Sequence, residues 1–387
     1  MDGVGNVCYR YALNFGEKGH ESYVVSPQTD TGYRGNYPFE IVDYTGIPLF
    51  KMKSYSVGMP GLDIHCQRRL GMIEADIAHL HTPFIAGQAG LAYAKKHKVP
   101  TVGMFHSKYY DDFLQITGVE LLADVGVKFV VDFYEKCDEV WAVSRSSADT
   151  LKSYGYKKDI FVMPNGTDIP HLDPDREEEL LSGFNLNKSD PILLYVGQMN
   201  RKKNIHCILE AAADVKMPFT LVMAGQGPHE EEIRKRAAEL GLGERVVFTG
   251  HISDPDTLNA LYKRASLFVF PSLYDTSGLV VREAAAMGTP SVVINGSSAA
   301  ECIEDGINGF CCENSPNSLA RAIEAVLDNP ELLKKAGLKA KETIPIPWNE
   351  LTDMVLDRYK TVIACHSEKQ EADMHQKQAK QEKRGRR

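Results

Sequence analysis

Residues 270–294 read FPSLYDTSGLVVREAAAMGTPSVVI, and this stretch decides the fold. It opens on the end of the apolar run 266–270, a β-prone segment typical of a buried parallel strand. A turn rich in Ser, Asp, Thr and Gly follows, and then a helix-compatible run over 279–287 that Pro290 prevents from continuing. The next strand begins at Ser291, so the stretch predicts a β–α–β unit.

The helix of this unit directs its N-terminal amide groups, over residues 276–280, to the carboxyl end of a strand. Parallel sheets bind anionic ligands at such places. Asp275 lies in the loop, and Glu283 lies just over one turn into the helix. A carboxylate cannot hold a phosphate, but it accepts hydrogen bonds from sugar or ribose hydroxyls beside one. This arrangement offers amide donors to a diphosphate and, beside them, carboxylates to hydroxyl groups. It therefore predicts a nucleotide-sugar site.

The same residues resemble a known family. Residues 275–283 resemble the E-x7-E segment of retaining glycosyltransferases with the GT-B fold, especially those of family 4, with Asp275 in place of the first Glu. The run REAAAMGTP over 282–290 continues the resemblance. HTPF at 81–84 and FHSKYYD at 105–111 resemble the branch of that family that includes diacylglycerol glucosyltransferases.

Composition limits the class of protein. A chain of 387 residues is long enough for two domains, and 43% hydrophobic with 25% charged residues is typical of a soluble globular protein. A net charge of −8 argues against a general nucleic-acid binder. No apolar run approaches the ~20 residues of a membrane span and no signal peptide opens the chain. We therefore expect a cytoplasmic protein, with the inner membrane face as an alternative location.

The eight cysteines include no C-x-x-C pair, which indicates free thiols in a reducing compartment and no metal site. Asp254-Pro-Asp256 has the form of a metal-binding D-x-D, but its position before a helix favours an N-cap. No cofactor is expected besides the nucleotide-sugar donor, which is a substrate.

The resemblance extends to about residue 365. It implies an α/β fold of two Rossmann-like domains with doubly wound parallel sheets that face a cleft. The expected parts are an N-terminal acceptor-side domain 1–168, a linker 169–189, a C-terminal nucleotide-sugar-binding domain 190–345, a helix 346–365 crossing back to the first domain, and a disordered basic tail 366–387.

The chain begins inside a glycine loop that contains Gly3 and Gly5. Because a β–α–β unit has a strand before such a loop, the first N-terminal strand is expected to be absent here, either because the start is misassigned or truncated or because this protein lacks that strand. In the family this loop approaches the donor phosphates. His106 follows the strand 100–105, and its position at the strand end together with the motif favours a place beside the transferred sugar. His81 is open between a site role and a loop cap.

The second domain opens with the strand 191–196, followed by GQMNRKKN over 197–204. Relatives read G-R-L-x-x-x-K-N there, and their Arg and Lys neutralise the diphosphate. Lys203 matches the lysine, whereas Gln198 stands at the arginine position. A departing diphosphate needs positive charge, which Arg201 or Lys202 of the same loop could add.

The resemblance implies a role for each candidate residue. Glu283 would bind the ribose, Asp275 with the amides of 276–278 the sugar hydroxyls, and His106 would orient the hexose. Lys203, with the amides of 279 and 280, would stabilise the diphosphate. The catalytic candidates are His106, Lys203, Asp275 and Glu283, and the donor-binding candidates are Gly3, Gly5, Gly197, Arg201, Gly250, His251, Ile252, Thr276, Ser277, Gly278, Leu279 and Val280.

The expected reaction moves a hexose from a UDP-type donor to a hydroxyl of a lipid or polysaccharide with retained configuration. The expected partners are the donor, an acceptor that the sequence leaves open and a peripheral membrane contact, but no nucleic acid. The helical run 115–136 is poor in basic residues and gives electrostatic docking on lipid little support. A catalytically silent accessory subunit is the alternative, since it would explain Gln198. A dehydrogenase is disfavoured, because no G-x-G-x-x-G follows a strand.

Overall fold

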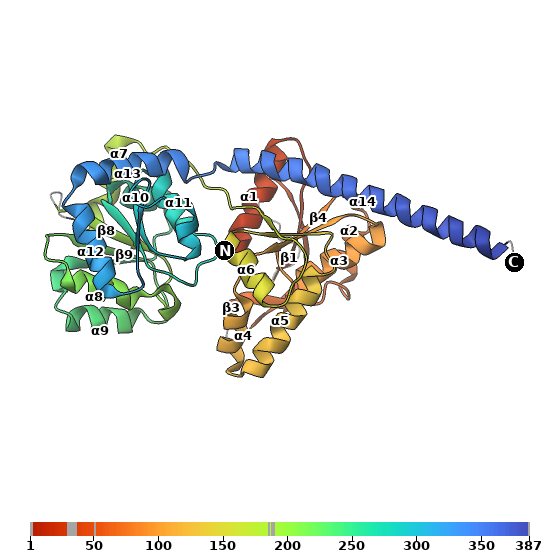
Figure 1. The fold of residues 1–387 in the computed structure, drawn as a ribbon, viewed down its shortest axis with the longest axis horizontal. Coiled ribbons are helices and arrows are strands. Elements are labelled where there is room, and N and C mark those ends of the chain that lie inside the picture. Colours follow the sequence, from red (N-terminus) through yellow and green to blue (C-terminus); the bar gives the residue numbers. More distant parts are fainter. Residues whose placement is uncertain (1–2, 29–36, 50–51, 185, 187–189, 386–387) are drawn as a thin grey trace. The chain divides into compact units, whose positions relative to one another are not determined.

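The computed structural model describes residues 3–28, 37–49, 52–184, 186 and 190–385. The chain forms two compact units, the first made of Met1–Pro164 with Trp348–Arg387 and the second of Asn165–Pro347 (Figure 1). Strands alternate with helices along most of both units, which confirms the predicted α/β class.

The second unit is built on one six-stranded sheet in the order β10-β9-β8-β11-β12-β13, and every neighbouring pair is parallel. Most strand residues are buried, as expected for a sheet covered by helices on both faces. The chain runs outward from β8 to β10 and returns to the other side of β8 as β11, so the strand order reverses between these two strands. The strands are β8 Ile192–Val196, β9 Thr220–Ala224, β10 Val246–Gly250, β11 Leu267–Phe270, β12 Ser291–Ile294 and β13 Phe310–Cys312.

Helices follow the strands in the order that the sequence predicts. The Asp254 carboxylate accepts a hydrogen bond from the Thr257 N–H at 2.9 Å, which confirms that Asp254 is an N-cap. The helices are α7 Pro174–Leu181, η1 Ser182–Phe184, η2 Arg201–Lys203, α8 Ile205–Asp214, α9 Glu230–Glu239, η3 Gly243–Arg245, α10 Pro255–Arg264, α11 Leu279–Ala286, η4 Ser298–Cys302, α12 Pro316–Leu327 and α13 Pro330–Thr343.

The interval 169–189, expected as a linker, contains α7 and η1. Helix α7 packs against α10 and is tied to it by an ion pair of 2.9 Å between Glu177 and Lys263. This interval is therefore a packed part of the second unit, because α7 carries apolar residues such as Leu181 that are buried against the sheet domain.

Gly225, at the carboxyl end of β9, lets two backbone segments approach closely. Its φ is +134°, and a Cβ there would lie 2.0 Å from the Gly197 carbonyl oxygen. We expect Gly225→Ala to lower the free energy of unfolding by about 1–3 kcal/mol, since the backbone must shift. Thermal unfolding measures this. Gly183→Ala is the control, because a Cβ at Gly183 meets no atom within 4 Å; an equal loss in both variants would contradict the close approach.

The first unit contains two sheets. Strands β4-β5-β6-β7 form a parallel sheet, whereas in β1-β2-β3 the pair β1–β2 is parallel and β2–β3 is antiparallel. The predicted fold of two domains with parallel sheets is confirmed, and β3 adds one antiparallel strand at the end of its sheet. The strands are β1 Tyr23–Gln28, β2 Glu40–Leu49, β3 Met52–Gly58, β4 Ala78–Leu80, β5 Thr101–Phe105, β6 Glu139–Ala142 and β7 Phe161–Val162.

Two helical predictions for the first unit need correction. Gly3 and Gly5 lie in the first turns of α1, not in a loop; Val7 and Tyr11 are buried one turn apart on that helix, and this amphipathic spacing outweighs the glycines. The expected single helix over 115–136 is broken at Gly118, whose φ of +67° ends α4. The helices are α1 Gly3–Glu17, α2 Ile64–Leu70, α3 Ile85–His97, α4 Tyr109–Thr117, α5 Glu120–Tyr134, α6 Arg145–Ser153 and α14 Trp348–Gly385.

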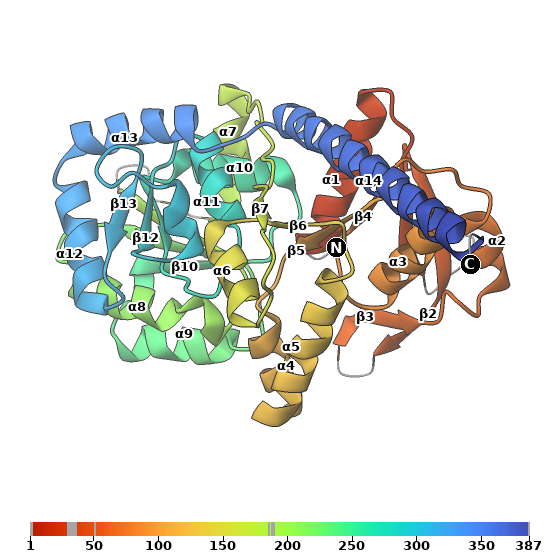
Figure 2. The same cartoon turned by 45° about the vertical axis from the view of Figure 1, so that its right-hand side comes forward.

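Helix α14 belongs to the first unit, where its first turns pack against α1 (Figure 2). It continues without a break to Gly385, so the prediction of a disordered tail after residue 365 is wrong. The physical reason is composition: the tail is rich in Glu, Gln, Lys and Ala, which are strong helix formers, and it contains no Pro.

The contact between α14 and β6 is both charged and aromatic. The Arg358 guanidinium donates to both carboxylate oxygens of Glu139, at 2.8 and 2.7 Å, and lies 4.4 Å from the ring centroid of Phe161. The Tyr359 ring stacks on Trp141 at 5.6 Å between centroids. Such a bidentate pair fixes the relative orientation of the two side chains as well as adding attraction.

Replacing Arg358 by Ala is expected to lower the free energy of unfolding of the first unit by about 1.5–3 kcal/mol, because a charged hydrogen-bonded pair loses one partner. Differential scanning calorimetry would report it. Lys360→Ala is the matched control on the same helix, since Lys360 pairs with Asp357 where both side chains are about three-quarters exposed. Equal destabilisation by the two variants would show that the Arg358–Glu139 pair contributes no more to stability than the exposed Lys360–Asp357 pair.

Candidate active site

The loops that follow β8 and β11 meet where the strand order reverses, the place where open α/β sheets bind ligands. Asn204, at the end of the β8 loop, adopts a left-handed conformation with a φ of 56°, and its Nδ2 donates to the Pro271 carbonyl at 3.1 Å. The Lys203 Nζ lies 3.2 Å from Asp275 Oδ1, and both side chains are 20% exposed. The structure thus brings together two residues that are 72 positions apart in the sequence.

Asp275 is held firmly in its loop. Its Oδ2 accepts hydrogen bonds from the N–H groups of Ser277, at 3.3 Å, and of Gly278. Its own carbonyl accepts from the Ser298 hydroxyl at 2.6 Å. Two of the amides that the sequence assigned to sugar hydroxyls, those of Ser277 and Gly278, therefore donate to Asp275 instead. The cause is local, because an Asp carboxylate in a turn commonly accepts hydrogen bonds from backbone N–H groups a few residues further along the chain.

The first turn of α11 presents the remaining amides. Gly278 precedes it with a φ of +61°, and a Cβ there would lie 3.2 Å from the Ala299 Cα. The N–H groups of Leu279 and Val280 have no hydrogen-bond acceptor within the described part of the chain. These donors and the Lys203 ammonium form an electropositive site for an anion.

Glu283 lies one turn further along α11 and is partly buried. Its Oε2 accepts a hydrogen bond from the Tyr262 hydroxyl of α10 at 2.9 Å. Burial raises the pKa of the Glu283 carboxyl above its ordinary value, and the charges of Asp168 and Asp275 act in the same direction, whereas the Tyr262 hydrogen bond opposes them. Glu283 is thus an acceptor whose charge is costly to keep.

Sequence reasoning missed two groups that act on Glu283, the Tyr262 hydroxyl and the charge of Asp168. Asp168 is the last residue of the expected first domain 1–168. Tyr262 carries no local signal, because its partner lies on a different helix.

The basic residues of the β8 loop point in different directions. The Arg201 guanidinium lies 2.9 Å from Glu232 on α9 and holds the pKa of that carboxyl below its ordinary value. The Lys202 Nζ lies 4.1 Å from the ring centroid of Tyr274. The Gln198 side chain accepts from the Asn200 amide at 2.7 Å. Of the three cations, Lys203 is the one that the structure pairs with Asp275.

Three predicted glycine-turn positions lie side by side at the carboxyl ends of β8, β9 and β10. The Gly197 N–H donates to the Ala224 carbonyl at 3.0 Å, and the Gly225 N–H donates to the Gly250 carbonyl at 2.8 Å. Gly250 has a φ of 71°. His251 is exposed and Ile252 is partly buried directly after it, so the backbone of this turn is open on the same edge of the sheet.

In the first unit, His106 follows β5 and is buried. Its Nε2 lies 3.0 Å from His81 Nδ1, and the two rings stack with centroids 5.2 Å apart. Burial lowers the pKa of His81 to about 4 and that of His106 well below its ordinary value. Both rings are therefore neutral near pH 7, and one nitrogen of the pair donates to the other. Gly3 and Gly5 lie on α1 of this unit.

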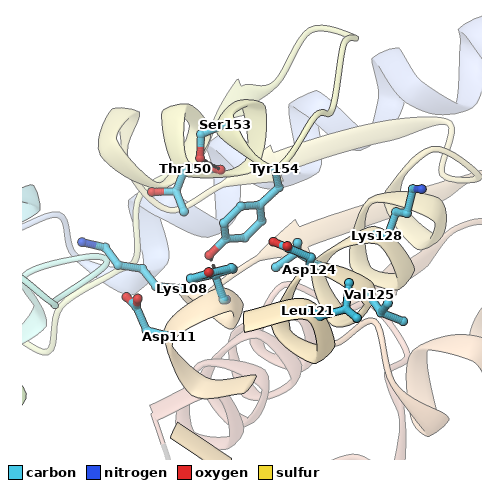
Figure 3. Close-up of a pocket in the computed structure, with 11 residues that line it drawn as sticks. Lys108, Asp111, Leu121, Asp124, Val125, Lys128, Thr150, Ser153 and Tyr154 are labelled. Carbon is cyan, nitrogen blue, oxygen red and sulfur yellow. Dashed lines mark hydrogen bonds between the residues drawn. The ribbon is translucent and has the colours of Figure 1, made fainter. Parts of the chain in front are cut away.

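A pocket of about 750 Å³, which sequence reasoning also missed, is lined by residues that include Lys108, two positions after His106 (Figure 3). Figure 3 shows the hydroxyls of Thr150 and Ser153 on one side and the α5 residues Leu121 and Val125 on the other. The Tyr154 hydroxyl accepts from the Tyr110 N–H at 3.0 Å. Hydroxyls and charges of both signs suit a polyhydroxylated ligand.

Within the described residues, no group of three or more His, Cys, Asp or Glu side chains is arranged to hold a metal ion. Nor is any described helix both long enough and apolar enough to cross a membrane; α14 is long but charged.

Comparisons with known proteins all point to glycosyltransferases. Two family models match consecutive parts of the chain, Glycosyltransferase Family 4 over residues 1–170 and Glycosyl transferases group 1 over residues 176–343. The alpha-monoglucosyldiacylglycerol synthase of Streptococcus pneumoniae is 27% identical over 86% of this chain and 77% of its own length. A GDP-mannose-dependent alpha-mannosyltransferase of Corynebacterium glutamicum is 24% identical over 94% of this chain and 86% of its own.

Solved structures show the same fold. Anabaena HepE, crystallised with UDP and glucose, superposes with a TM-score of 0.73 at 18% identity and covers 93% of this chain and 96% of its own. Sucrose-phosphate synthase from Thermosynechococcus elongatus superposes with a TM-score of 0.78 at 20% identity, over 94% of both chains.

Fold and site together define a GT-B glycosyltransferase, an enzyme that moves a sugar from a nucleotide-sugar donor. The two family models leave little of residues 1–343 unmatched. The chain consists of a Glycosyltransferase Family 4 domain followed by a Glycosyl transferases group 1 domain.

Proposed function

We propose that this enzyme transfers a hexose from a UDP-sugar to a hydroxyl group of a lipid acceptor, with retention of the anomeric configuration. The observation that carries the proposal is the pairing of Lys203 with Asp275 at the point where the strand order reverses, directly before the open amides of α11. A cation and free amides suit a diphosphate, while adjacent carboxylates suit hydroxyls.

Each residue has one task in this proposal. Lys203 and the N–H groups of Leu279 and Val280 bind the diphosphate and stabilise the charge that grows on it as it departs. Asp275 accepts from a sugar hydroxyl, and Glu283 accepts from the ribose hydroxyls. The Ser277 and Gly278 amides, which donate to Asp275, hold that carboxylate in place. The remaining donor contacts are proposed for Arg201, for the backbone of Thr276, for Gly3 and Gly5 of α1, and for the turns at Gly197 and at Gly250, His251 and Ile252.

His106 contacts the transferred hexose in this proposal, and His81 positions it. Because His106 Nε2 is bonded to His81 Nδ1, the other nitrogen of His106 remains for a sugar hydroxyl. Both rings are neutral, so they orient the sugar without adding charge.

Retention follows from attack on the same face that the diphosphate leaves. The bond between the anomeric carbon and the β-phosphate oxygen breaks, and the acceptor hydroxyl oxygen bonds to that carbon. Its proton passes to a departing phosphate oxygen. The protein supplies position and positive charge rather than a nucleophile.

A lipid acceptor is supported by two observations. The Streptococcus pneumoniae relative is named for a glucosyldiacylglycerol product. The first unit exposes large apolar side chains on α5, such as Leu121 and Val125, which are 70% and 59% exposed. A reaction with lipid would take place at the cytoplasmic face of the membrane.

The test incubates the protein with radiolabelled UDP-sugars and GDP-mannose, with diacylglycerol as the acceptor. The expected result is a labelled glycolipid whose mass is that of acceptor plus one hexose and whose anomeric proton in NMR matches that of the donor. An inverted anomer would overturn retention. Failure to bind any donor in calorimetry would favour the silent accessory subunit instead.

Removal of metal ions tests where the positive charge comes from. We expect EDTA to leave the transfer rate unchanged, because Lys203 and the α11 amides supply the charge that a divalent cation supplies in other enzymes. The rate is measured before and after dialysis against EDTA. A loss that Mg²⁺ or Mn²⁺ restores would contradict this role for Lys203.

A further inference from the structure

An apolar groove of about 630 Å³ lies between α2 and α3 of the first unit, and we call it the α2–α3 groove. Its walls come from both helices, from the segment before α2 and from α5. The apolar side chains that line it include Met59, Leu70, Phe84, Ile85, Ala89 and Phe129. Its volume lies within the range of small-molecule sites.

The groove is elongated. Phe84 and Ile85 line it at the start of α3, and Lys96 and His97 line it at the end of the same helix. At 1.5 Å per residue, this stretch of α3 is about 18 Å long. An extended hydrocarbon chain has that shape, whereas a folded sugar does not.

Apolar side chains continue from the groove onto the surface beside it. Met59, which lines the groove, is 69% exposed, and Leu62 and Ile64 in the next turn of chain are 76% and 78% exposed. Met72, directly after the lining residue Gly71, is 69% exposed. So much apolar surface around one groove marks an interaction site.

One end of the groove lies beside the loops that carry the histidine pair. Phe84, which lines the groove, and His81 belong to the same short loop after β4, and His81 Nδ1 lies 3.0 Å from His106 Nε2. The Phe84 ring also packs edge-on against Tyr109, three residues after His106, at 5.6 Å between centroids. The Phe84 end of a bound ligand is therefore the end nearer to these loops.

We propose that the α2–α3 groove binds one hydrocarbon chain of the acceptor, with the hydroxyl to be glycosylated at the Phe84 end and the chain running along α3. This inference rests on the proposed function, since it assumes that the acceptor is a lipid. It assigns the recognition of the chain to a site separate from the donor-binding loops of the second unit.

The test uses monoacylglycerols of increasing chain length below their critical micelle concentrations. We expect kcat/KM to rise by about fourfold for each methylene that enters the groove, and to level off once the groove is full. Ala92 lines the groove and is exposed, so Ala92→Trp narrows it without burying new bulk in the core. This variant should flatten the chain-length dependence while donor affinity stays at its native value.

Lys95→Trp is the matched control, because Lys95 is exposed on the same helix but does not line the groove. It should keep the native dependence on chain length. If Ala92→Trp also keeps the native dependence, or if Val125→Trp on α5 abolishes it instead, the chain binds elsewhere and the inference is overturned.

Direct binding separates the groove from the proposed function. A fluorescent fatty-acyl probe is titrated into the native protein and into both α3 variants. Binding that only Ala92→Trp loses supports the groove, even if no donor is used and the proposed function fails. Equal binding by all three proteins, or by none, overturns the groove whatever the activity.

Discussion

Replacing Lys203 by Ala is expected to lower kcat by about two to three orders of magnitude, the usual effect of removing one preorganised group that stabilises a developing negative charge. Lys203 is the cation that the structure places against Asp275, at 3.2 Å, beside the open amides of α11. Because Gln198 stands where relatives carry an arginine, this loop has one cation fewer, and the diphosphate depends more on Lys203. Initial rates at saturating donor measure the effect.

The same loop provides the controls. Lys202→Ala removes a cation that lies over the Tyr274 ring, and Arg201→Ala removes one that pairs with Glu232 on α9. Both are expected to change kcat far less than Lys203→Ala. A loss in Arg201→Ala as large as that in Lys203→Ala would show that the Arg201 guanidinium leaves Glu232 when the donor binds.

Stability must be followed in parallel, since Lys203→Ala leaves the Asp275 carboxylate without its counter-ion. Both side chains of the pair are only 20% exposed, but Asp275 keeps its hydrogen bonds from Ser277 and Gly278, so the carboxylate retains part of its stabilisation. We therefore expect a small change in the melting temperature. A large change would assign the kinetic loss to unfolding rather than to catalysis.

The sequence predicts well which strands are parallel and which residues follow them, because both are consequences of local sequence pattern. Apolar runs followed by glycine turns and helices define parallel strands, and the residues after such strands lie at one edge of the sheet. That rule alone places Lys203 and Asp275 within reach of each other. It also places His106 at the end of β5, although it says nothing of how the His106 ring is held.

The features that were missed depend on packing between elements distant in the sequence. The bond from Tyr262 to Glu283 and that from His81 to His106 each join side chains of separate elements, whose rotamers are set by the assembled core. The pairing of the Ser277 and Gly278 amides with Asp275 was open to prediction, since Asp side chains in turns commonly accept from nearby backbone N–H groups. The resemblance to the family motif instead predicted that these amides bind a ligand.

Glu283→Gln is expected to weaken donor binding by about ten- to a hundredfold, because a hydrogen bond to a charged acceptor contributes about 1.5–3 kcal/mol. The change is isosteric, so the Tyr262 hydroxyl still has an acceptor and the fold should be preserved. Calorimetric titration with a UDP-sugar measures the affinity. The same titration with a 2′-deoxyribose analogue tests the role: the native protein should lose affinity for it, and Glu283→Gln should lose little more.

The pH dependence of binding gives an independent test of the same carboxylate. Burial and the charges of Asp168 and Asp275 raise the pKa of Glu283 above its ordinary value of 4.5, so the acceptor is lost at a higher pH than for an exposed Glu. Donor affinity should therefore fall as the pH is lowered through that raised pKa, and the fall should be absent in Glu283→Gln. A UDP-sugar suits this measurement because its esterified phosphates do not titrate in the range.

Tyr262→Phe tests the direction in which Tyr262 shifts the pKa of Glu283. The Tyr262 hydroxyl stabilises the charged form of Glu283 and so lowers its pKa. Without that hydroxyl the pKa rises further, and the acid-side loss of affinity should move to higher pH while the affinity at alkaline pH stays near the native value. Two results would contradict this. Donor affinity could fall at the same pH in Tyr262→Phe as in the native protein, or the acid-side fall could persist in Glu283→Gln. Either result would assign the titration to another group and remove Glu283 from the ribose site.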